Sequence, residues 1–141
     1  MTTPLRDVIN AVCTRLDTAG VAYWPGPDGT YPKTPPRRPA FAKRLPATPP
    51  EALAVATYGL DLQPDPQDPS EVFRVQVRSR APYDADPPAD QALAALHGQH
   101  HQVWAGVRVQ RCRHLSTAQL GADPSTGLDE RTDNYEIEVL P

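Results

Sequence analysis

Residues 72–99, VFRVQVRSRAPYDADPPADQALAALHGQ, decide the fold that we expect for this chain. The stretch begins with strict alternation, so that Phe73, Val75 and Val77 would lie on one side of an extended strand. Arginine and glutamine occupy the positions between them and would lie on the other side. A period of two with aromatic and β-branched residues is typical of a strand with one buried face.

The turn and helix that follow would fold back onto this strand. Asp86 can cap a helix, and Pro87 suits the first helical position, because a backbone N–H there would have no partner in any case. Gly98 would end the helix. Its apolar face would consist of Ala89, Ala92, Leu93 and Leu96. The sequence therefore predicts a strand, a tight acidic turn and a short amphipathic helix that covers the apolar side of the strand.

Proline limits how much of the chain can join a core. Of the 141 residues, 18 are proline, far above the usual ~5%. Proline cannot donate to a strand ladder and is not tolerated inside a helix. The apolar content of 39% is also below the usual ~45–50%. We therefore expect one domain, residues 1–141, whose small core carries long loops or arms, and not a compact enzyme with a deep cleft.

Charge and cysteine content narrow the class of protein further. A net charge of −3 argues against a dedicated nucleic-acid binder, which is usually basic. There is no apolar run of ~18 residues for a membrane span, and the first ten residues lack the pattern of a signal peptide. Cys13 and Cys112 fall in periodic segments and are expected to be buried free thiols. We expect a reduced, cytoplasmic protein.

The other periodic segments predict one more helix and four more strands. The helix is expected at residues 5–16, where Thr3 and Pro4 form a capping pair, and the strands at 21–24, 52–60, 103–115 and 134–140. Beyond Gln110 the alternation loses its phase, which indicates a bulge. Residues 61–70 and 116–132 are expected to be loops, the second because of its turn formers Gly121, Asp123, Pro124 and Gly127.

Together these elements predict an α+β domain: a mainly antiparallel sheet of four to five strands with two helices packed on one face. On the other face, Arg74, Arg78 and Arg108 would lie opposite Glu136 and Glu138, and each such cross-strand pair contributes about 0.2–1 kcal/mol. The predicted core consists of Leu5, Val8, Val12, Leu16, Phe73, Val75, Val77, Leu93, Leu96, Val107, Val109, Tyr135, Ile137 and Val139.

Residues 25–50 differ in composition from the rest of the chain. Nine of these 26 residues are proline, and only Asp28 is acidic. Such a segment buries too little surface to fold alone, and Pro-rich chains stay extended. It is either a solvated loop or an arm that reaches a neighbouring subunit. Its basic residues are Lys33, Arg37, Arg38, Lys43 and Arg44.

No pattern of catalytic residues, metal ligands or cofactor-binding residues stands out. His97 and His101 have the spacing of a helical ligand pair, but Gly98 lies between them and no cysteine or carboxylate completes a set. They, with His100, are expected to be exposed imidazoles near a helix C-terminus. The chain also lacks a Gly-rich phosphate loop and a nucleophile elbow. We expect a protein that is not an enzyme and binds no metal or cofactor.

An ordered series of short motifs resembles a known family. VQVRSR at residues 75–80 is followed by a Pro/Asp turn and an alanine-rich helix that ends in Leu-His-Gly at 96–98. Then come Val107 and Val109, Arg113 and Ser116, LGAD at 120–123, Arg131, and NYEIEV at 134–139. In this order the chain resembles the tail terminator family of long-tailed bacteriophages, also described as tail-completion or minor capsid proteins.

The resemblance implies a structural role in a virion. Tail terminators form a ring, usually a hexamer, on the last ring of the tail tube, stop its polymerisation and offer a surface to the neck or head-completion protein. Double-stranded DNA passes through the lumen without specific binding. The protein would be assembled in the host cytoplasm and found at the tail or neck of the virion. A ring requires a head-to-tail interface that closes on itself.

Other functions stay open at the level of sequence. A neck or head-closure protein, one ring higher in the same head–tail connector, shares the pattern. A nucleic-acid-binding module would use the basic residues of 25–50, and a small hydrolase would use the scattered histidines. For the ring, contact regions are expected at 31–50 and 117–131, with the interface residues Lys33, Arg37, Arg38, Lys43, Arg44, Asp123, Asp129 and Arg131.

Overall fold

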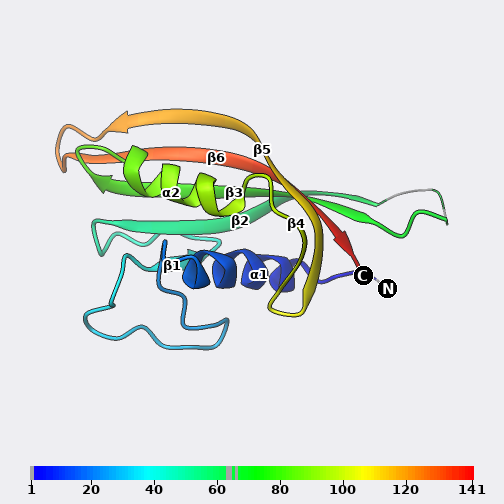
Figure 1. Ribbon diagram of the computed structural model, residues 1–141. Helices are drawn as coiled ribbons and strands as arrows, with labels where there is room; N and C mark the ends of the chain where they lie inside the picture. Colours follow the sequence, from blue (N-terminus) through cyan, green and yellow to red (C-terminus); the bar gives the residue numbers. More distant parts are fainter. Residues whose placement is uncertain (1, 63–64, 66) are drawn as a thin grey trace.

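The protein folds into one six-stranded sheet with two helices (Figure 1), in a computed structural model that describes residues 2–62, 65 and 67–141. The helices are α1 (Leu5–Thr18) and α2 (Asp86–Leu96). The strands are β1 (Ala40–Ala42), β2 (Ala52–Leu62), β3 (Glu71–Pro82), β4 (His100–Trp104), β5 (Val107–Ala122) and β6 (Leu128–Leu140). They lie in the order β1-β2-β3-β6-β5-β4. The predicted α+β class is confirmed; the sheet is mixed, because β1 runs parallel to β2.

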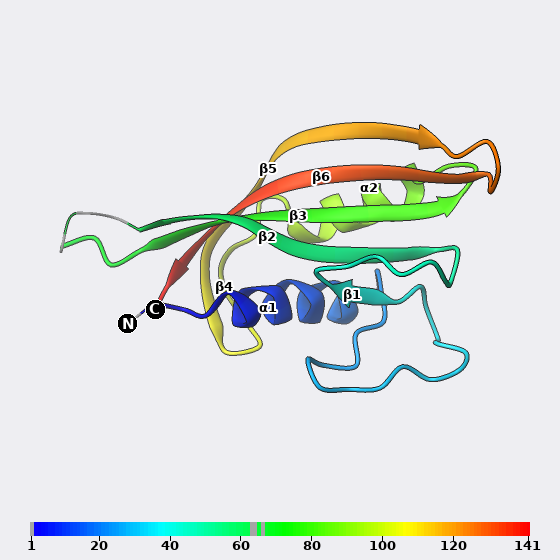
Figure 2. The ribbon, with the colours of Figure 1, turned by 180° about the vertical axis from the view of Figure 1, so that it is seen from behind.

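The predicted strand and helix of residues 72–99 form the centre of this sheet. β3 pairs antiparallel with β2 on one side and with β6 on the other along almost its whole length. Its alternation has the expected result, since Phe73, Val75 and Val77 are at most 1% exposed. β2 and β3 continue as a hairpin beyond the body of the molecule (Figures 1 and 2).

Both helices pack on the same face of the sheet and share one core with it. α2 lies in front of the sheet in Figure 1 and behind it in Figure 2. Of the predicted core residues, Leu5 is 46% exposed, because it is the first residue of α1 and lies at the end of the apolar stripe. Leu93 is half-buried against the core. The others are buried: Val8, Val12, Leu16, Phe73, Val75, Val77, Leu96, Val107, Val109, Tyr135, Ile137 and Val139.

Neither predicted helix cap is present. Asp86 is the first helical residue of α2, and the N-cap is Ala85, whose backbone N–H donates to Asp129 Oδ2 at 2.8 Å. A carboxylate from β6 therefore replaces the local cap. At α1 the N-cap is Pro4, while the Thr3 hydroxyl and backbone N–H both donate to Glu71. At α2 a tertiary contact thus satisfies the N–H of the N-cap residue, whereas at α1 the Glu71 carboxylate binds the residue before the N-cap.

The prediction of a loop at residues 116–132 is wrong. β5 continues to Ala122, β6 begins at Leu128, and only the turn at 123–127 is irregular. Gly121 has a φ of 81° and lies where the β5–β6 register shifts, so it marks a bulge inside the strand and not its end. The turn residues therefore form the tip of a long hairpin.

Residues 103–115, predicted as one strand, belong to two strands, β4 and β5. β4 and β5 form a hairpin whose turn is Ala105 and Gly106, both with positive φ. The bulge expected beyond Gln110 is confirmed by a register shift between Val109 and Arg111. The sequence signal for the turn was weak, because alanine rarely adopts positive φ.

The Pro-rich segment folds back on its own chain. Tyr23 forms an isolated parallel bridge with Pro39 in place of the strand predicted at 21–24, and β1 then pairs with residues 53–55 of β2. The Tyr31 hydroxyl donates to Ala40 O at 2.5 Å. Ala40 itself is fully buried. Part of the proline-rich segment thus contributes to the core. The loop predicted at 61–70 begins later than expected, after Leu62, and its residues 63, 64 and 66 are outside the described residues.

The face of the sheet opposite the helices is charged and internally paired. Arg74 lies opposite Glu136, with 3.6 Å between the charged atoms, as expected. Arg78 instead pairs with Glu130 at 2.7 Å, and Arg108 donates to the Pro141 carbonyl. The bulge brings two other arginines into this face: Arg111 lies 3.6 Å from Glu138 and Arg113 lies 3.4 Å from Glu136.

Candidate assembly surfaces

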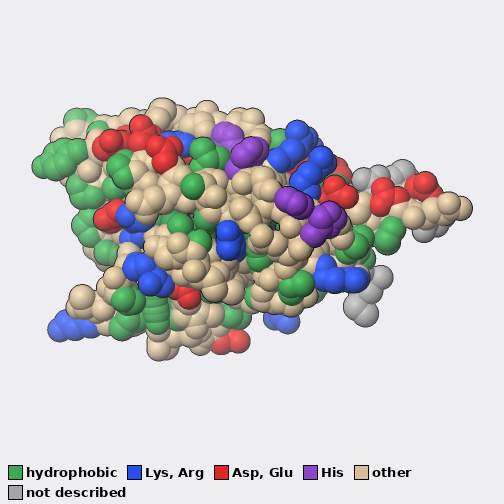
Figure 3. Space-filling view, viewed as in Figure 1, with side chains coloured by type: hydrophobic (Ala, Val, Ile, Leu, Met, Phe, Trp, Pro, Cys, Tyr) green, Lys and Arg blue, Asp and Glu red, His purple; other side chains and the backbone are tan. Residues whose placement is uncertain are grey.

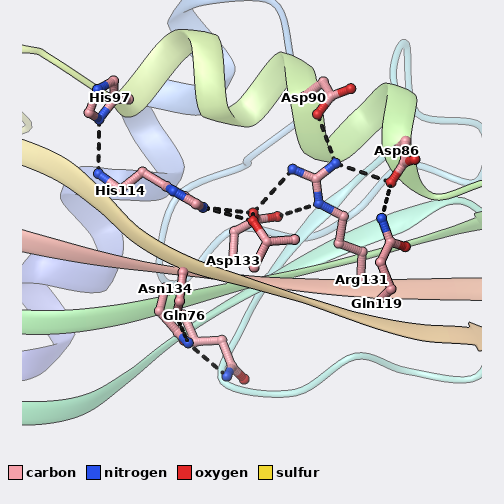
Figure 4. A network of polar contacts seen from close by, with 11 residues as sticks. Gln76, Asp86, Asp90, His97, His114, Gln119, Arg131, Asp133 and Asn134 are labelled. Atoms are coloured by element: carbon pink, nitrogen blue, oxygen red, sulfur yellow. Dashed lines mark hydrogen bonds and ion pairs between the residues drawn. The ribbon is translucent and has the colours of Figure 1, made fainter.

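A network of polar side chains lies between α2 and the sheet (Figure 4). Arg131, on β6, is its centre: its guanidinium Nη1 donates to Asp90 Oδ1 at 2.7 Å and to Asp86 Oδ1 at 3.1 Å, and its Nη2 donates to Asp133 Oδ1 at 3.2 Å. Asp86 and Asp90 are one helical turn apart on α2, so both point towards the same guanidinium. The arrangement ties the first turns of α2 to β6.

The network continues along β5. His114 Nε2 lies 2.9 Å from Asp133 Oδ1, and the Thr117 hydroxyl donates to the same oxygen at 2.5 Å. The backbone N–H of His114 donates to the ring of His97, just beyond α2. In a hydrolase triad the imidazole stands between hydroxyl and carboxylate. Here the hydroxyl contacts the carboxylate directly, so the geometry differs from that relay and resembles a structural clamp.

Burial and hydrogen bonding set the charge state of this network. Burial lowers the pKa of Arg131, but its hydrogen bonds to Asp90, Asp133 and Asp86 outweigh burial and raise the pKa above its usual range. A hydrogen bond from Gln119, followed by that from Arg131, lowers the pKa of Asp86. The contact between Asp86 and Arg131 is therefore fully present above the ordinary pKa of an aspartate. It is lost as the pH falls through the lowered pKa of Asp86.

Two residues predicted as interface contacts belong to the interior of the subunit. Arg131 is 6% exposed and Asp129 is 9% exposed, both on β6 instead of in a loop. Asp129 caps α2, and Arg131 holds Asp86 and Asp90. Sequence reasoning missed the network, although Arg131 and Asp133 are in phase with the buried alternation of β6, which was the available signal.

The basic residues of the Pro-rich segment are not gathered at one place. Arg38 is largely buried, and donates to Glu51 at 2.8 Å, to Val21 O at 2.9 Å and to Gln91 at 2.7 Å. Arg37 pairs with Asp17 at 2.5 Å. Lys33, Lys43 and Arg44 are exposed. Figure 3 shows basic side chains divided among several places on this face, while acidic ones gather over the start of α2.

The remaining candidates also have local roles. Asp123 accepts hydrogen bonds from the backbone and hydroxyl of Ser125, and thereby shapes the tip of the β5–β6 hairpin. A cleft of about 370 Å³ lies between α1 and the Pro-rich segment, and its lining includes Trp24 and Asn10. The Trp24 indole donates to Asn10 at 2.9 Å, so both polar groups are satisfied within the chain.

The histidines make separate contacts and do not form one site. His97 accepts from the backbone of His114, while the rings of His100 and His101 contact each other at the exposed start of β4. Within residues 2–62, 65 and 67–141, no three His, Cys, Asp or Glu side chains are placed to hold a metal ion. Neither of the two described helices is long and apolar enough to cross a membrane.

Comparisons with known proteins found similarity to solved structures but to no family model. No family model matches the chain, and no curated protein matches it. Among solved structures, a chain from the virion of a native gene transfer agent particle aligns with a TM-score of 0.47 and 15% sequence identity. The alignment covers 70% of this chain and 77% of that chain. Its name describes the particle as a whole and not the role of the aligned chain.

Proposed function

We propose that the protein is a structural virion protein, a tail terminator that forms a ring on the end of a phage-type tail tube, stops its growth and receives the neck protein. The observation that carries this proposal is the placement of the motifs that resemble the family. They lie on β3, α2, β5 and β6, which are joined by the ladders of one sheet and by the Arg131 network. The resemblance thus covers one continuous structural unit and not scattered loops.

The contacts between α2 and β6 in this unit are suited to a subunit that keeps its shape in a ring. The clamp between α2 and β6 fixes a helix on a sheet through a buried cation, so the subunit has few ways to deform. Buried polar groups hold packed elements in one arrangement when they are hydrogen-bonded, as Arg131 Nη1 and Nη2 are here.

The sheet face without helices suits a channel that passes DNA without holding it. Four of its arginines, Arg74, Arg78, Arg111 and Arg113, each lie within 4 Å of a glutamate carboxylate, and Arg108 donates to the Pro141 carbonyl. Phosphate affinity depends on unpaired Lys and Arg. A charge-balanced face would therefore let DNA slide past.

The test is tube capping. The tail tube protein of the same particle is polymerised with and without this chain, and tubes are measured by negative-stain electron microscopy. We expect shorter tubes that carry extra density at one end only. Tubes of unchanged length without a cap would overturn the proposal. Binding to the head-side neck ring but never to tubes would instead make this a head-closure protein.

A further inference from the structure

The sheet leaves two strand edges without a partner among the described residues. β1 covers β2 only at residues 53–55, so residues 56–62 have a free edge. β4 covers β5 only as far as Arg111, and the last contact on that side is the bond from the backbone of His114 to His97. We call residues 56–62 the β2 edge and residues 116–122 the β5 edge.

Both edges are nearly free of the charges and prolines that normally prevent strands from pairing between molecules, although a register shift lies in each, between Thr57 and Gly59 in β2 and between Gln119 and Gly121 in β5. Proteins protect open edges with charges, prolines or very short strands. The β5 edge, STAQLGA, has no charge and no proline, and the β2 edge has only Asp61. Apolar side chains lie exposed along both: Tyr58 at 52%, Leu60 at 39%, Leu62 at 53% and Leu120 at 52%. Exposed apolar groups on open edges point to a partner strand.

The directions of the strands make the two edges complementary to each other. Each neighbouring pair in the series β2-β3-β6-β5 is antiparallel. β2 and β5 therefore run in opposite directions. If two copies have the same orientation along a common axis, the β5 edge of one meets the β2 edge of the next in antiparallel fashion. This is the head-to-tail geometry that closes into rings.

The tilt of strands in closed sheets selects a register for the two edges. Through the ladders, Thr117 lies level with Asp133, Val77 and Val55. For Thr117 to lie opposite Leu60 of a neighbouring copy, that copy must be displaced along the strand direction. The displacement is the distance from Val55 to Leu60, about 17 Å. This displacement accumulates over four strand spacings, about 19 Å. The strands would then tilt by about 40° from the ring axis, within the range of about 35–45° found in barrels.

We propose that the β5 edge of one copy pairs with the β2 edge of the next, so that the sheets of all copies join into one continuous closed sheet. This inference rests on the proposed function in one respect, because it takes the ring from that proposal. What it adds is the interface between neighbouring subunits of the ring. The contact adds main-chain hydrogen bonds, and brings Leu60 and Leu62 of one copy beside the β5 edge of the other.

A pair of cysteines tests the register. With Thr117 opposite Leu60, Asp61 lies opposite Ser116, and both side chains lie on the helix-free face, next to Arg74 and Asn134 respectively. Within one chain they are on opposite edges of the sheet, too far apart for a disulfide, which needs Cα atoms within about 7 Å. The native Cys13 and Cys112 are buried and do not interfere.

The variant carrying Asp61→Cys and Ser116→Cys is oxidised at high protein concentration and run on a non-reducing gel. We expect a ladder of linked copies that ends in a closed species. The control carries Tyr83→Cys, at a site 86% exposed, with Ser116→Cys, and should give no ladder. No ladder from the first pair, or equal ladders from both, would overturn the proposal.

Charges on the edges provide a second measurement. Leu60→Lys or Ala118→Lys should shift sedimentation to the monomer while circular dichroism stays unchanged, whereas Tyr83→Lys should leave assembly intact. Wild-type rings that cap tubes, with no ladder and no effect of lysine, would refute this interface and leave the proposed function standing. Edge-linked closed assemblies that never cap tubes would refute the function and leave the interface standing.

Discussion

At the scale of single residues, Arg131 decides how α2 is held. Its side chain is 7% exposed, while Asp86 and Asp90 on the helix keep 44% and 62% exposure. The third carboxylate, Asp133, is 1% exposed. Burying a charge is costly unless it is paired and hydrogen-bonded. The guanidinium therefore compensates a buried carboxylate on its own strand and two partly solvated ones on the helix.

We predict that Arg131→Met destabilises the protein by about 3 kcal/mol, because it leaves the buried Asp133 without its cation. Urea denaturation followed by circular dichroism measures the change. The matched control is Arg113→Met: Arg113 lies 3.4 Å from Glu136 but is 49% exposed, and exposed pairs contribute about 0–1 kcal/mol. Equal effects of the two substitutions would contradict a buried clamp.

At the scale of elements, the Pro-rich segment is held by two arginines from different sides. Arg38 lies within it and reaches Glu51, Val21 and Gln91. Arg80, on β3, donates to the carbonyls of Pro49 and Pro50 at 2.6 and 3.0 Å. Proline lacks an N–H, so a segment of this composition offers mainly carbonyls to its surroundings. Arginine, with five donors, satisfies such carbonyls well.

We predict that Arg38→Ala loosens the segment without unfolding the domain. Loss of a partly exposed ion pair and its bonds, about 1 kcal/mol, would raise the locally open fraction about fivefold. Trypsin cleavage after Lys33 and Lys43, timed by mass spectrometry, should accelerate accordingly. Arg6→Ala is the control, because Arg6 is exposed and its contact with Asp7 is 4.0 Å long. Unchanged cleavage in Arg38→Ala would show that other contacts hold the segment.

At the scale of the whole molecule, charge is paired within the subunit instead of being gathered into a patch. The net charge is −3. On the helix-free face, Glu130, Glu136 and Glu138 neutralise the arginines of β3 and β5. Among the residues that the structure describes, this face therefore presents few unpaired cations, which suits the channel of the proposed ring.

We predict weak binding of double-stranded DNA that disappears between about 50 and 200 mM salt. Fluorescence anisotropy of a labelled duplex measures it. Combining Glu136→Gln with Glu138→Gln should free arginines and tighten binding at low salt, whereas Asp28→Asn, in the exposed Pro-rich segment, should change binding far less. Tight binding by the wild type at about 200 mM salt would point to a nucleic-acid-binding module instead.

The elements with strong periodicity were predictable, and those that depend on distant partners were not. β3, both helices and the start of β2 followed from apolar spacing. The end of the β5–β6 hairpin, residues 116–132, was predicted as a loop, because Gly121, Asp123, Pro124 and Gly127 are turn formers. Of the candidate site, the basic residues were visible in the sequence, but their partners Asp17, Glu51 and Gln91 lie far away along the chain.

The sequence by itself determined the α+β class, the central strand and helix, and the burial of the alternating face, because these depend on spacing between near neighbours. Only the tertiary structure decided that Arg131 and Asp129 clamp α2, that the Pro-rich segment supplies β1, and that β2 and β5 keep open edges. The physical reason is that backbone pairing and charge compensation are satisfied by whichever group the fold brings close. No local pattern specifies that partner.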